Sequence, residues 1–210
     1  MPIILSYTGG FLQTNACFFA HESNPNSGIL IDAPEGAADW LEENDLTPTA
    51  LLLTHLHFDH ILGAGKVQVS FECPIYSHSA RHPDLTLENL FKGFMGTSFS
   101  IDPFTVNHLL EGTHTLEVDG HDFRLLYLPG HSPDSLGFYC KEANAIFSGD
   151  VLMAGGVGRF DFPGGNWDTL ESSIRHGLYT LPDSTLVYPG HGPVTTIGAE
   201  KRSNPYVIAE

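Results

Sequence analysis

Four short apolar segments of this sequence run directly into a side chain that can bind a metal. They cover residues 51–54, 125–130, 145–149 and 186–190, and the side chains that follow them are, in the same order, His55, His131, Asp150 and His191. The segments have the length and bounding residues of buried strands. In sheets flanked by helices, ligands usually bind in the loops beyond the carboxyl ends of the strands. We therefore expect a binding site built from these four ends.

The rest of the apolar pattern predicts a mixed α/β fold, with sheets covered by helices. Further strands are expected at residues 28–31 and 75–77, and Asp119-Gly120 predicts a hairpin turn between residues 115–118 and 121–127. Helices are expected at residues 37–44, 60–71, 84–94 and 168–179. The last has an apolar stripe at four-residue spacing, formed by Leu170, Ile174 and Leu178.

Length and composition fit a single soluble domain. The chain has 210 residues, of which 41% are hydrophobic and only 16% are charged, so we expect one domain over residues 1–210. No apolar run approaches the roughly 18 residues of a membrane span, and the start lacks the basic region of a secretory signal. We expect a cytoplasmic protein without a membrane partner.

The charge balance argues against nucleic acid as a partner. Nine Lys and Arg residues against 25 Asp and Glu residues give a formal charge of -16, and a field of that sign repels phosphate backbones. The cysteines, Cys17, Cys73 and Cys140, lack CxxC spacing and suggest neither a disulfide framework nor a cysteine zinc site. The anomaly is in the twelve histidines, which outnumber all Lys and Arg residues together.

The densest group of histidines is the segment THLHFDH at residues 54–60. On an extended segment His55 and His57 point to the same side, and a turn into a helix would bring Asp59 and His60 round to the same cavity. Imidazole and carboxylate ligands suit zinc, iron or manganese, whereas calcium and magnesium prefer oxygen ligands alone. The segment therefore predicts a transition-metal site.

Together the candidates would hold two divalent metal ions, and zinc, iron and manganese all remain open. In one division of these candidates, the first ion is bound by His55, His57 and His131, and the second ion is bound by Asp59, His60 and His191. Asp150 then bridges the two ions. This set leaves positions open for water, as catalytic metal sites do. The pKa of a water that bridges two such ions falls toward about 7, which makes hydroxide available at neutral pH. Asp59 and Asp150 are then the expected catalytic carboxylates, with Asp59 also orienting the hydroxide.

Five stretches of the chain carry a resemblance to a known family. They are THLHFDH at residues 54–60, PGHSPDSLGFY at 129–139, FSGD at 147–150, GGVGRFDFPGG at 155–165 and YPGHGP at 188–193. The chain resembles metallo-β-lactamase fold hydrolases of the glyoxalase II (hydroxyacylglutathione hydrolase) type, in particular their short bacterial members. The resemblance implies a four-layer αββα sandwich and the same two ligand sets at one edge of the paired sheets. The chain departs from glyoxalase II proper in one respect, since we expect no C-terminal glutathione-binding helical domain after Glu210.

The reaction that the resemblance implies is hydrolysis of a small-molecule thioester, such as S-lactoylglutathione, by a metal-bridging hydroxide. A thiol leaves with a pKa near 8.5 and needs little help from a general acid, whereas an amide nitrogen needs a positioned proton donor. The sequence GPVTTIGAEKRSNPY, which follows His191, favours the hydrolase.

An alternative of the same fold is a mononuclear iron persulfide dioxygenase. That branch shares the GRxDF stretch seen at residues 158–162, and His55, His131 and Asp150 would then form a facial triad. A nuclease of this fold and a metal-binding module without catalysis are disfavoured, the first by the acidic charge and the second by the open coordination positions.

Two further features have two interpretations each. Arg159, in a glycine-rich stretch, either binds a substrate carboxylate or pairs with Asp161 to stabilise its loop. A set of apolar residues between Asp84 and Phe104 forms either a mobile lid or a helix face packed on its own core. The residues of this set are Phe91, Phe94, Met95, Phe99 and Phe104.

Overall fold

The computed structural model describes residues 2–95 and 100–208. Phe99 and the side chains of Phe94 and Met95, which belong to the possible lid, lie outside the described part of the chain. The chain forms two compact units, Met1–Glu111 and Gly112–Glu210, which we call unit 1 and unit 2. Within the described residues, the helices are too short or too polar for any of them to cross a membrane.

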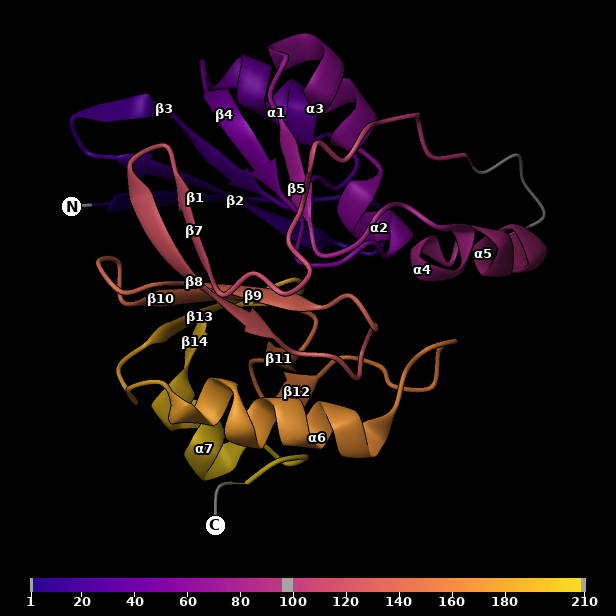
Figure 1. Cartoon of the computed structure of the whole chain (residues 1–210), viewed down its shortest axis with the longest axis vertical. Coiled ribbons are helices and arrows are strands. Elements are labelled where there is room, and N and C mark those ends of the chain that lie inside the picture. The colour runs from indigo at the N-terminus through magenta and orange to yellow at the C-terminus, as the bar shows by residue number, and fades with distance from the viewer. Residues whose placement is uncertain (1, 96–99, 209–210) are drawn as a thin grey trace. The chain divides into compact units, whose positions relative to one another are not determined.

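Unit 1 is built on a six-stranded sheet with the order β1-β2-β3-β4-β5-β6. Strands β1 to β5 are labelled in Figure 1. Its strands are β1 Pro2–Gly9, β2 Thr14–His21, β3 Asn24–Ile31, β4 Thr47–Leu52, β5 Ile75–Ser77 and β6 His108–Leu109. Its helices are α1 Ala37–Glu43, α2 Phe58–Ile61, α3 Ala64–Phe71, α4 Pro83–Thr86 and α5 Glu88–Met95. The first three strands pair antiparallel, and β3 to β6 pair parallel. The carboxyl ends of β3 and β4 therefore meet at one edge of this sheet.

The centre of the unit 1 sheet is buried on both faces. The apolar run from Ala50 to Leu53 is fully buried, which is typical of a central parallel strand. Helices α1 and α3 contact each other and both contact β4, so they cover one face of the sheet.

In unit 1, two helices predicted as continuous are interrupted. The helix expected at residues 60–71 is split into α2 and α3, because the backbone N–H of Gly63 donates to the carbonyl of Ala33 (2.8 Å). A Cβ at Gly63 would lie 2.4 Å from the carbonyl oxygen of Pro34, so only glycine allows this close approach. The helix expected at residues 84–94 breaks at Leu87, whose φ is 54°. The β1–β2 hairpin was not predicted at all.

Unit 2 contains a second six-stranded sheet, with the order β14-β13-β10-β9-β8-β7, and a small sheet of β11 and β12. Its strands are β7 Thr115–Val118, β8 His121–Tyr127, β9 Leu136–Cys140, β10 Ala145–Gly149, β11 Leu152–Met153, β12 Gly156–Val157, β13 Leu186–Pro189 and β14 Thr195–Thr196. Its helices are α6 Trp167–His176, the 3-10 helix η1 Leu178–Thr180 and α7 Ile197–Ser203. The predicted hairpin is confirmed, with Val118 paired to His121.

Strand directions in unit 2 bring three strand ends to one edge. β10 and β13 pair parallel, while β9 pairs antiparallel with both β8 and β10. Strands β8, β10 and β13 therefore run in the same direction. Each of them leads into one of the predicted ligands of this unit.

The core of unit 2 lies between one face of its large sheet and the helices α6, η1 and α7. Side chains from β8, β9, β10 and β13 form one buried cluster with residues of these helices. Leu170, Ile174 and Leu178, the predicted apolar stripe, are all completely buried. The helix predicted at residues 168–179 is not continuous, however, because α6 ends at His176 and Leu178 lies in η1. This packing holds α6 and α7 on the sheet that carries the strand ends.

Candidate metal centre

In unit 1, the segment after β4 gathers four candidate ligands. The ring of His55 lies 4.6 Å from that of His57 and 4.1 Å from that of His60, measured between centroids. An oxygen of Asp59, Oδ2, lies 3.6 Å from Nε2 of His60. All four side chains are buried, so the turn into α2 that was expected from the sequence places imidazoles and a carboxylate in one small region.

Asp32 holds this segment in place, and it was not among the predicted site residues. It follows β3, and its carboxylate accepts hydrogen bonds from the backbone N–H of Thr54 (2.8 Å) and from its hydroxyl (2.7 Å). It also lies 2.8 Å from Nδ1 of His60. A carboxylate accepts from Nδ1–H, which leaves the lone pair of His60 on Nε2, the nitrogen nearer to Asp59. Asp32 thus holds the imidazole of His60 in the tautomer and orientation that a metal ligand needs.

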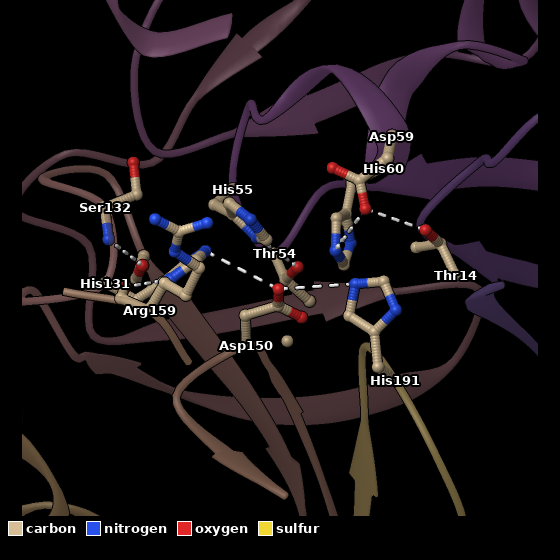
Figure 2. A network of polar contacts seen from close by, with 12 residues as sticks. Thr14, Thr54, His55, Asp59, His60, His131, Ser132, Asp150, Arg159 and His191 are labelled. Carbon is tan, nitrogen blue, oxygen red and sulfur yellow. Dashed lines mark hydrogen bonds and ion pairs between the residues drawn. The ribbon is translucent and has the colours of Figure 1, made fainter. Parts of the chain in front are cut away.

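Asp59 is fixed from a third strand. The hydroxyl of Thr14, at the start of β2, donates to Oδ2 of Asp59 at 2.7 Å, as Figure 2 shows. The Thr54 hydroxyl lies 3.1 Å from Nδ1 of His55. Contacts from β2, β3 and the end of β4 therefore orient the candidate ligands of unit 1.

In unit 2, one carboxylate oxygen lies close to two imidazoles. Oδ2 of Asp150 is 3.6 Å from Nε2 of His131 and 3.4 Å from Nε2 of His191 (Figure 2). These residues follow β8, β10 and β13, and the backbone N–H of Gly190 donates to the carbonyl of Gly149 (2.9 Å), which extends the pairing of β10 and β13 to the ligands. The parallel strands thus deliver His191 beside Asp150.

The donor atoms fit transition-metal ions. In a tetrahedral site with bonds of about 2.0–2.1 Å, neighbouring ligand atoms lie roughly 3.3 Å apart. The spacings in unit 2 are close to this value, and imidazole with carboxylate is a donor set that zinc, iron and manganese accept. Asp150 and the two histidines are therefore suited in chemistry and spacing to share metal ions.

A backbone carbonyl orients His131. Nδ1 of His131 lies 2.6 Å from the carbonyl oxygen of Arg159, so Nδ1–H donates and Nε2 carries the lone pair. Residue 158, which precedes Arg159, must be glycine. A Cβ at Gly158 would lie 1.9 Å from the carbonyl oxygen of Asp150 and 2.8 Å from Nδ1 of His131. The segment after β12 thus contacts the ring of His131 and fixes its orientation.

The side chain of Arg159 is paired with Asp161. Two hydrogen bonds of 2.9 and 2.7 Å join the guanidinium to the carboxylate, and both side chains are more than half exposed. The bonds raise the pKa of Arg159 and hold the pKa of Asp161 below its ordinary value. The guanidinium also lies 4.1 Å from the ring centroid of Phe162. The loop-stabilising pair that the sequence suggested is therefore present.

Two of the apolar residues proposed as a lid are packed within unit 1. The ring of Phe91 lies 4.3 Å from that of Phe58, and the guanidinium of Arg81 lies 5.3 Å from the ring centroid of Phe104. Phe91 lies in helix α5 and Phe104 lies in a loop. Both contacts are within unit 1, as expected of the second interpretation, a helix face packed on its own core.

Comparison with known proteins covers most of the chain. The family model described as the metallo-beta-lactamase superfamily matches residues 9–191. A probable metallo-hydrolase, YqgX of Bacillus subtilis, is 38% identical, with 94% of each chain covered. The hydroxyacylglutathione hydrolase GloC of Haemophilus influenzae is 39% identical, with 91% of this chain and 92% of the relative covered.

Two solved structures are similar over nearly the whole chain. The BLEG-1 B3 metallo-beta-lactamase has a TM-score of 0.88 and 33% identity, covering 98% of this chain and 99% of that one. TTHA1623 in a di-iron-bound form has a TM-score of 0.82 and 36% identity, covering 97% and 100%. These similarities confirm the predicted fold class, the metallo-β-lactamase fold with its mixed α/β structure and two sheets.

Proposed function

The chain belongs to the metallo-β-lactamase superfamily and is a metal-dependent hydrolase, and from this premise we propose that it hydrolyses thioesters of small acyl groups, such as S-lactoylglutathione. The similarity to a protein named hydroxyacylglutathione hydrolase supports this substrate class. The strongly acidic composition, with a formal charge of -16, supports a small molecule over nucleic acid as substrate.

The proposed centre uses the ligands of both units for two divalent ions. The ligands from unit 1 are His55, His57, Asp59 and His60, and those from unit 2 are His131, Asp150 and His191. The observation that carries the proposal is the position of Asp150 Oδ2, within 3.6 Å of one imidazole nitrogen and 3.4 Å of another, as expected of a carboxylate shared by two ions. The similarity to TTHA1623, whose crystal structure is of a di-iron-bound form, supports a pair of ions. Zinc, iron and manganese are all compatible with the ligands.

Bound ions supply Lewis acidity for a carbonyl and lower the pKa of coordinated water toward about 7. The residues of the chain prepare for this chemistry. Asp32 and the carbonyl of Arg159 hold His60 and His131 as tautomers whose Nε2 carries a lone pair. Thr14 fixes the carboxylate of Asp59, which in this proposal orients the attacking water. A thiolate leaves with little need for a general acid, and so a thioester suits such a site better than an amide.

We assign Arg159 to the carboxylate of the substrate. Its pair with Asp161 is exposed, and exposed ion pairs contribute little to stability, so a substrate carboxylate can replace Asp161. The Arg159→Ala variant should raise KM for a thioester that carries a carboxylate and leave KM for an uncharged thioester unchanged. An equal rise for both thioesters would contradict this role.

The second candidate, a mononuclear iron persulfide dioxygenase, is favoured by one observation, the GRFDF sequence at residues 158–162. In that reading His55, His131 and Asp150 would bind one iron, and the remaining ligands would have no catalytic role.

We place the enzyme in the cytoplasm. Its three cysteines, Cys17, Cys73 and Cys140, are free and buried, and burial raises the pKa of Cys17 to about 12 and that of Cys73 to about 11. Thiols with such pKa values are protonated and unreactive at neutral pH. A protein that depends on no disulfide suits a reducing compartment.

The test compares substrates on purified protein of known metal content. We expect turnover of S-lactoylglutathione, loss of it on treatment with a chelator, and recovery on adding Zn²⁺, Fe²⁺ or Mn²⁺. A β-lactam and glutathione persulfide with an oxygen electrode serve as competing substrates. His191→Ala should abolish turnover, while His176→Ala, which changes an exposed histidine, is the matched control. Oxygen uptake on persulfide with one iron per chain, and no thioester turnover, would establish the second candidate instead.

A further inference from the structure

A buried carboxylate in helix α7 lies outside the predicted site. Glu200 is only 3% exposed. Its Oε1 accepts a hydrogen bond from the hydroxyl of Thr195 (2.6 Å), and its Oε2 accepts from the backbone N–H of Gly155 (3.0 Å) and from Nδ2 of Asn204 (2.8 Å). Among the residues that the structure describes, no Lys or Arg forms an ion pair with it. Three neutral donors therefore compensate for its burial.

The hydrogen bond to Thr195 links Glu200 to the segment that carries His191. Thr195 belongs to β14, which pairs with β13 through Val187, and His191 lies in the short connection between these strands. A shift of Thr195 would move one end of this connection. The carboxylate of Glu200 therefore restrains the loop that holds His191.

The hydrogen bond to Gly155 links Glu200 to His131. Gly155 lies in the turn between β11 and β12, and Nδ2 of Asn204 fixes the same turn by donating to the carbonyl of Gly156 (3.1 Å). The chain then runs directly through Gly158 to Arg159, whose carbonyl oxygen is 2.6 Å from Nδ1 of His131. The position of this turn thus sets the position of the carbonyl that orients His131.

We propose that Glu200 is a positioning residue for the metal centre, because one carboxylate fixes both the turn that orients His131 and the strand that follows His191. It is not one of the proposed ligands, and its carboxylate accepts hydrogen bonds from Thr195, Gly155 and Asn204. The role rests on the proposed assignment of His131 and His191 as ligands, but it does not depend on which substrate is hydrolysed. Removal of Glu200 should loosen the unit 2 ligands and leave those of unit 1 unchanged.

The test uses the full chain and measures Zn²⁺ affinity by competition with a chromophoric chelator. Glu200→Ala should raise the Kd of the more weakly held ion about tenfold, the lower end of what loss of a residue behind a metal ligand costs. Glu200→Gln should restore near-wild-type affinity, because its amide oxygen can accept from Gly155 and its NH2 group can donate to the Thr195 hydroxyl. Amide hydrogen exchange in the 154–158 turn should speed up in the Ala variant only.

A matched control separates positioning from general stability. Tyr179→Phe removes a buried hydrogen bond of the same region, from the tyrosine hydroxyl to the carbonyl of Val207 (2.7 Å), without touching either ligand segment. It should lower the melting temperature and leave the Kd for Zn²⁺ unchanged. If Glu200→Ala does not fold, Thr195→Val, which removes one hydroxyl, should still raise that Kd several-fold.

Wild-type Zn²⁺ affinity and wild-type exchange in a folded Glu200→Ala protein would overturn the proposal. So would equal changes of affinity in the Tyr179→Phe control. A protein that binds two ions with this pattern of variants but hydrolyses no thioester would support the positioning role and contradict only the proposed substrate.

Discussion

The two units provide their candidate ligands in opposite ways. In unit 1, four ligands lie between His55 and His60, and the local chain brings them together. In unit 2, three ligands are spread from His131 to His191 and meet only because three strands end at the same edge of one sheet. The first arrangement needs the chain to turn once, whereas the second needs a whole sheet and its supporting turns. Ligand geometry in unit 2 should therefore be the more sensitive to changes far along the chain.

The largest effect is expected from substitution of Asp150, the candidate ligand of unit 2 whose carboxylate lies close to both His131 and His191. Asp150→Ala removes the proposed shared carboxylate, so activity should fall by about 10³-fold or more and both ions should bind more weakly. Metal content and kcat/KM measure these effects. Asp122→Asn, which alters an exposed carboxylate of β8, is the control. Loss of a single ion with the other held as in the wild type would show that Asp150 is not shared.

Asp32→Ala tests whether the compact segment of unit 1 still needs outside support. The change leaves two buried donors of Thr54 without an acceptor and releases His60, so we expect about 2–3 kcal/mol of destabilisation and a 10- to 100-fold loss of metal affinity. Unfolding of the metal-free protein and Zn²⁺ titration give the two values.

Asp45→Ala is the matched control for Asp32→Ala. Both aspartates have a positive φ, 58° for Asp32 and 55° for Asp45, so strain from alanine in that conformation is common to both variants. Asp45 is exposed. Metal affinity lowered equally in both would mean that the hydrogen bonds of Asp32 are unimportant for the centre.

A single methyl group should disturb the support of His131 in unit 2. In Gly158→Ala the added Cβ would lie 1.9 Å from the carbonyl oxygen of Asp150, so the segment must shift, and kcat/KM should fall about 10- to 100-fold. Gly156→Ala is an apt control, because its Cβ would have its nearest neighbour at 3.9 Å. Steady-state kinetics of both variants suffice, and wild-type activity of Gly158→Ala would refute the support of His131 by this segment.

The smallest effect is expected at an ion pair in which neither partner is a candidate ligand. Asp183 accepts from Lys201 at 2.7 Å, and this hydrogen bond holds the pKa of Asp183 below its ordinary value. A carboxyl whose pKa is lower in the folded state stabilises the protein above its unfolded pKa and loses this effect as the pH falls through the folded pKa. Asp183→Asn should therefore lower the melting temperature by less than about 2 °C at pH 7, and the difference should vanish as the pH falls below the folded-state pKa of Asp183. A difference that persists in acid would assign the effect to something other than the ion pair.

What the sequence could predict follows the same contrast between the units. The segment of residues 54–60 was identified as a ligand set because its members are neighbours in the chain. His131, Asp150 and His191 were singled out because each follows an apolar strand. Asp32 carries the same signal, since it directly follows the strand expected at residues 28–31, but a lone aspartate without histidine neighbours was not recognised.

Features that depend on long-range packing left no comparable signal. Glu200 lies in the sequence GAEKRS, which is typical of an exposed helix, and only the fold shows that its carboxylate is buried against Thr195 and Gly155. The break between α2 and α3 arises from contact of Gly63 with Ala33 and Pro34, distant in the sequence. Helix periodicity alone contains no information about such contacts.

The most direct test of the proposed metal centre is anomalous diffraction from crystals loaded with one metal, recorded on both sides of its absorption edge. We expect two peaks per chain, each with imidazole nitrogens at about 2.0–2.1 Å, and the carboxylate of Asp150 in contact with both. A single peak, or ions bound away from His55, His131 and His191, would contradict the two-ion centre.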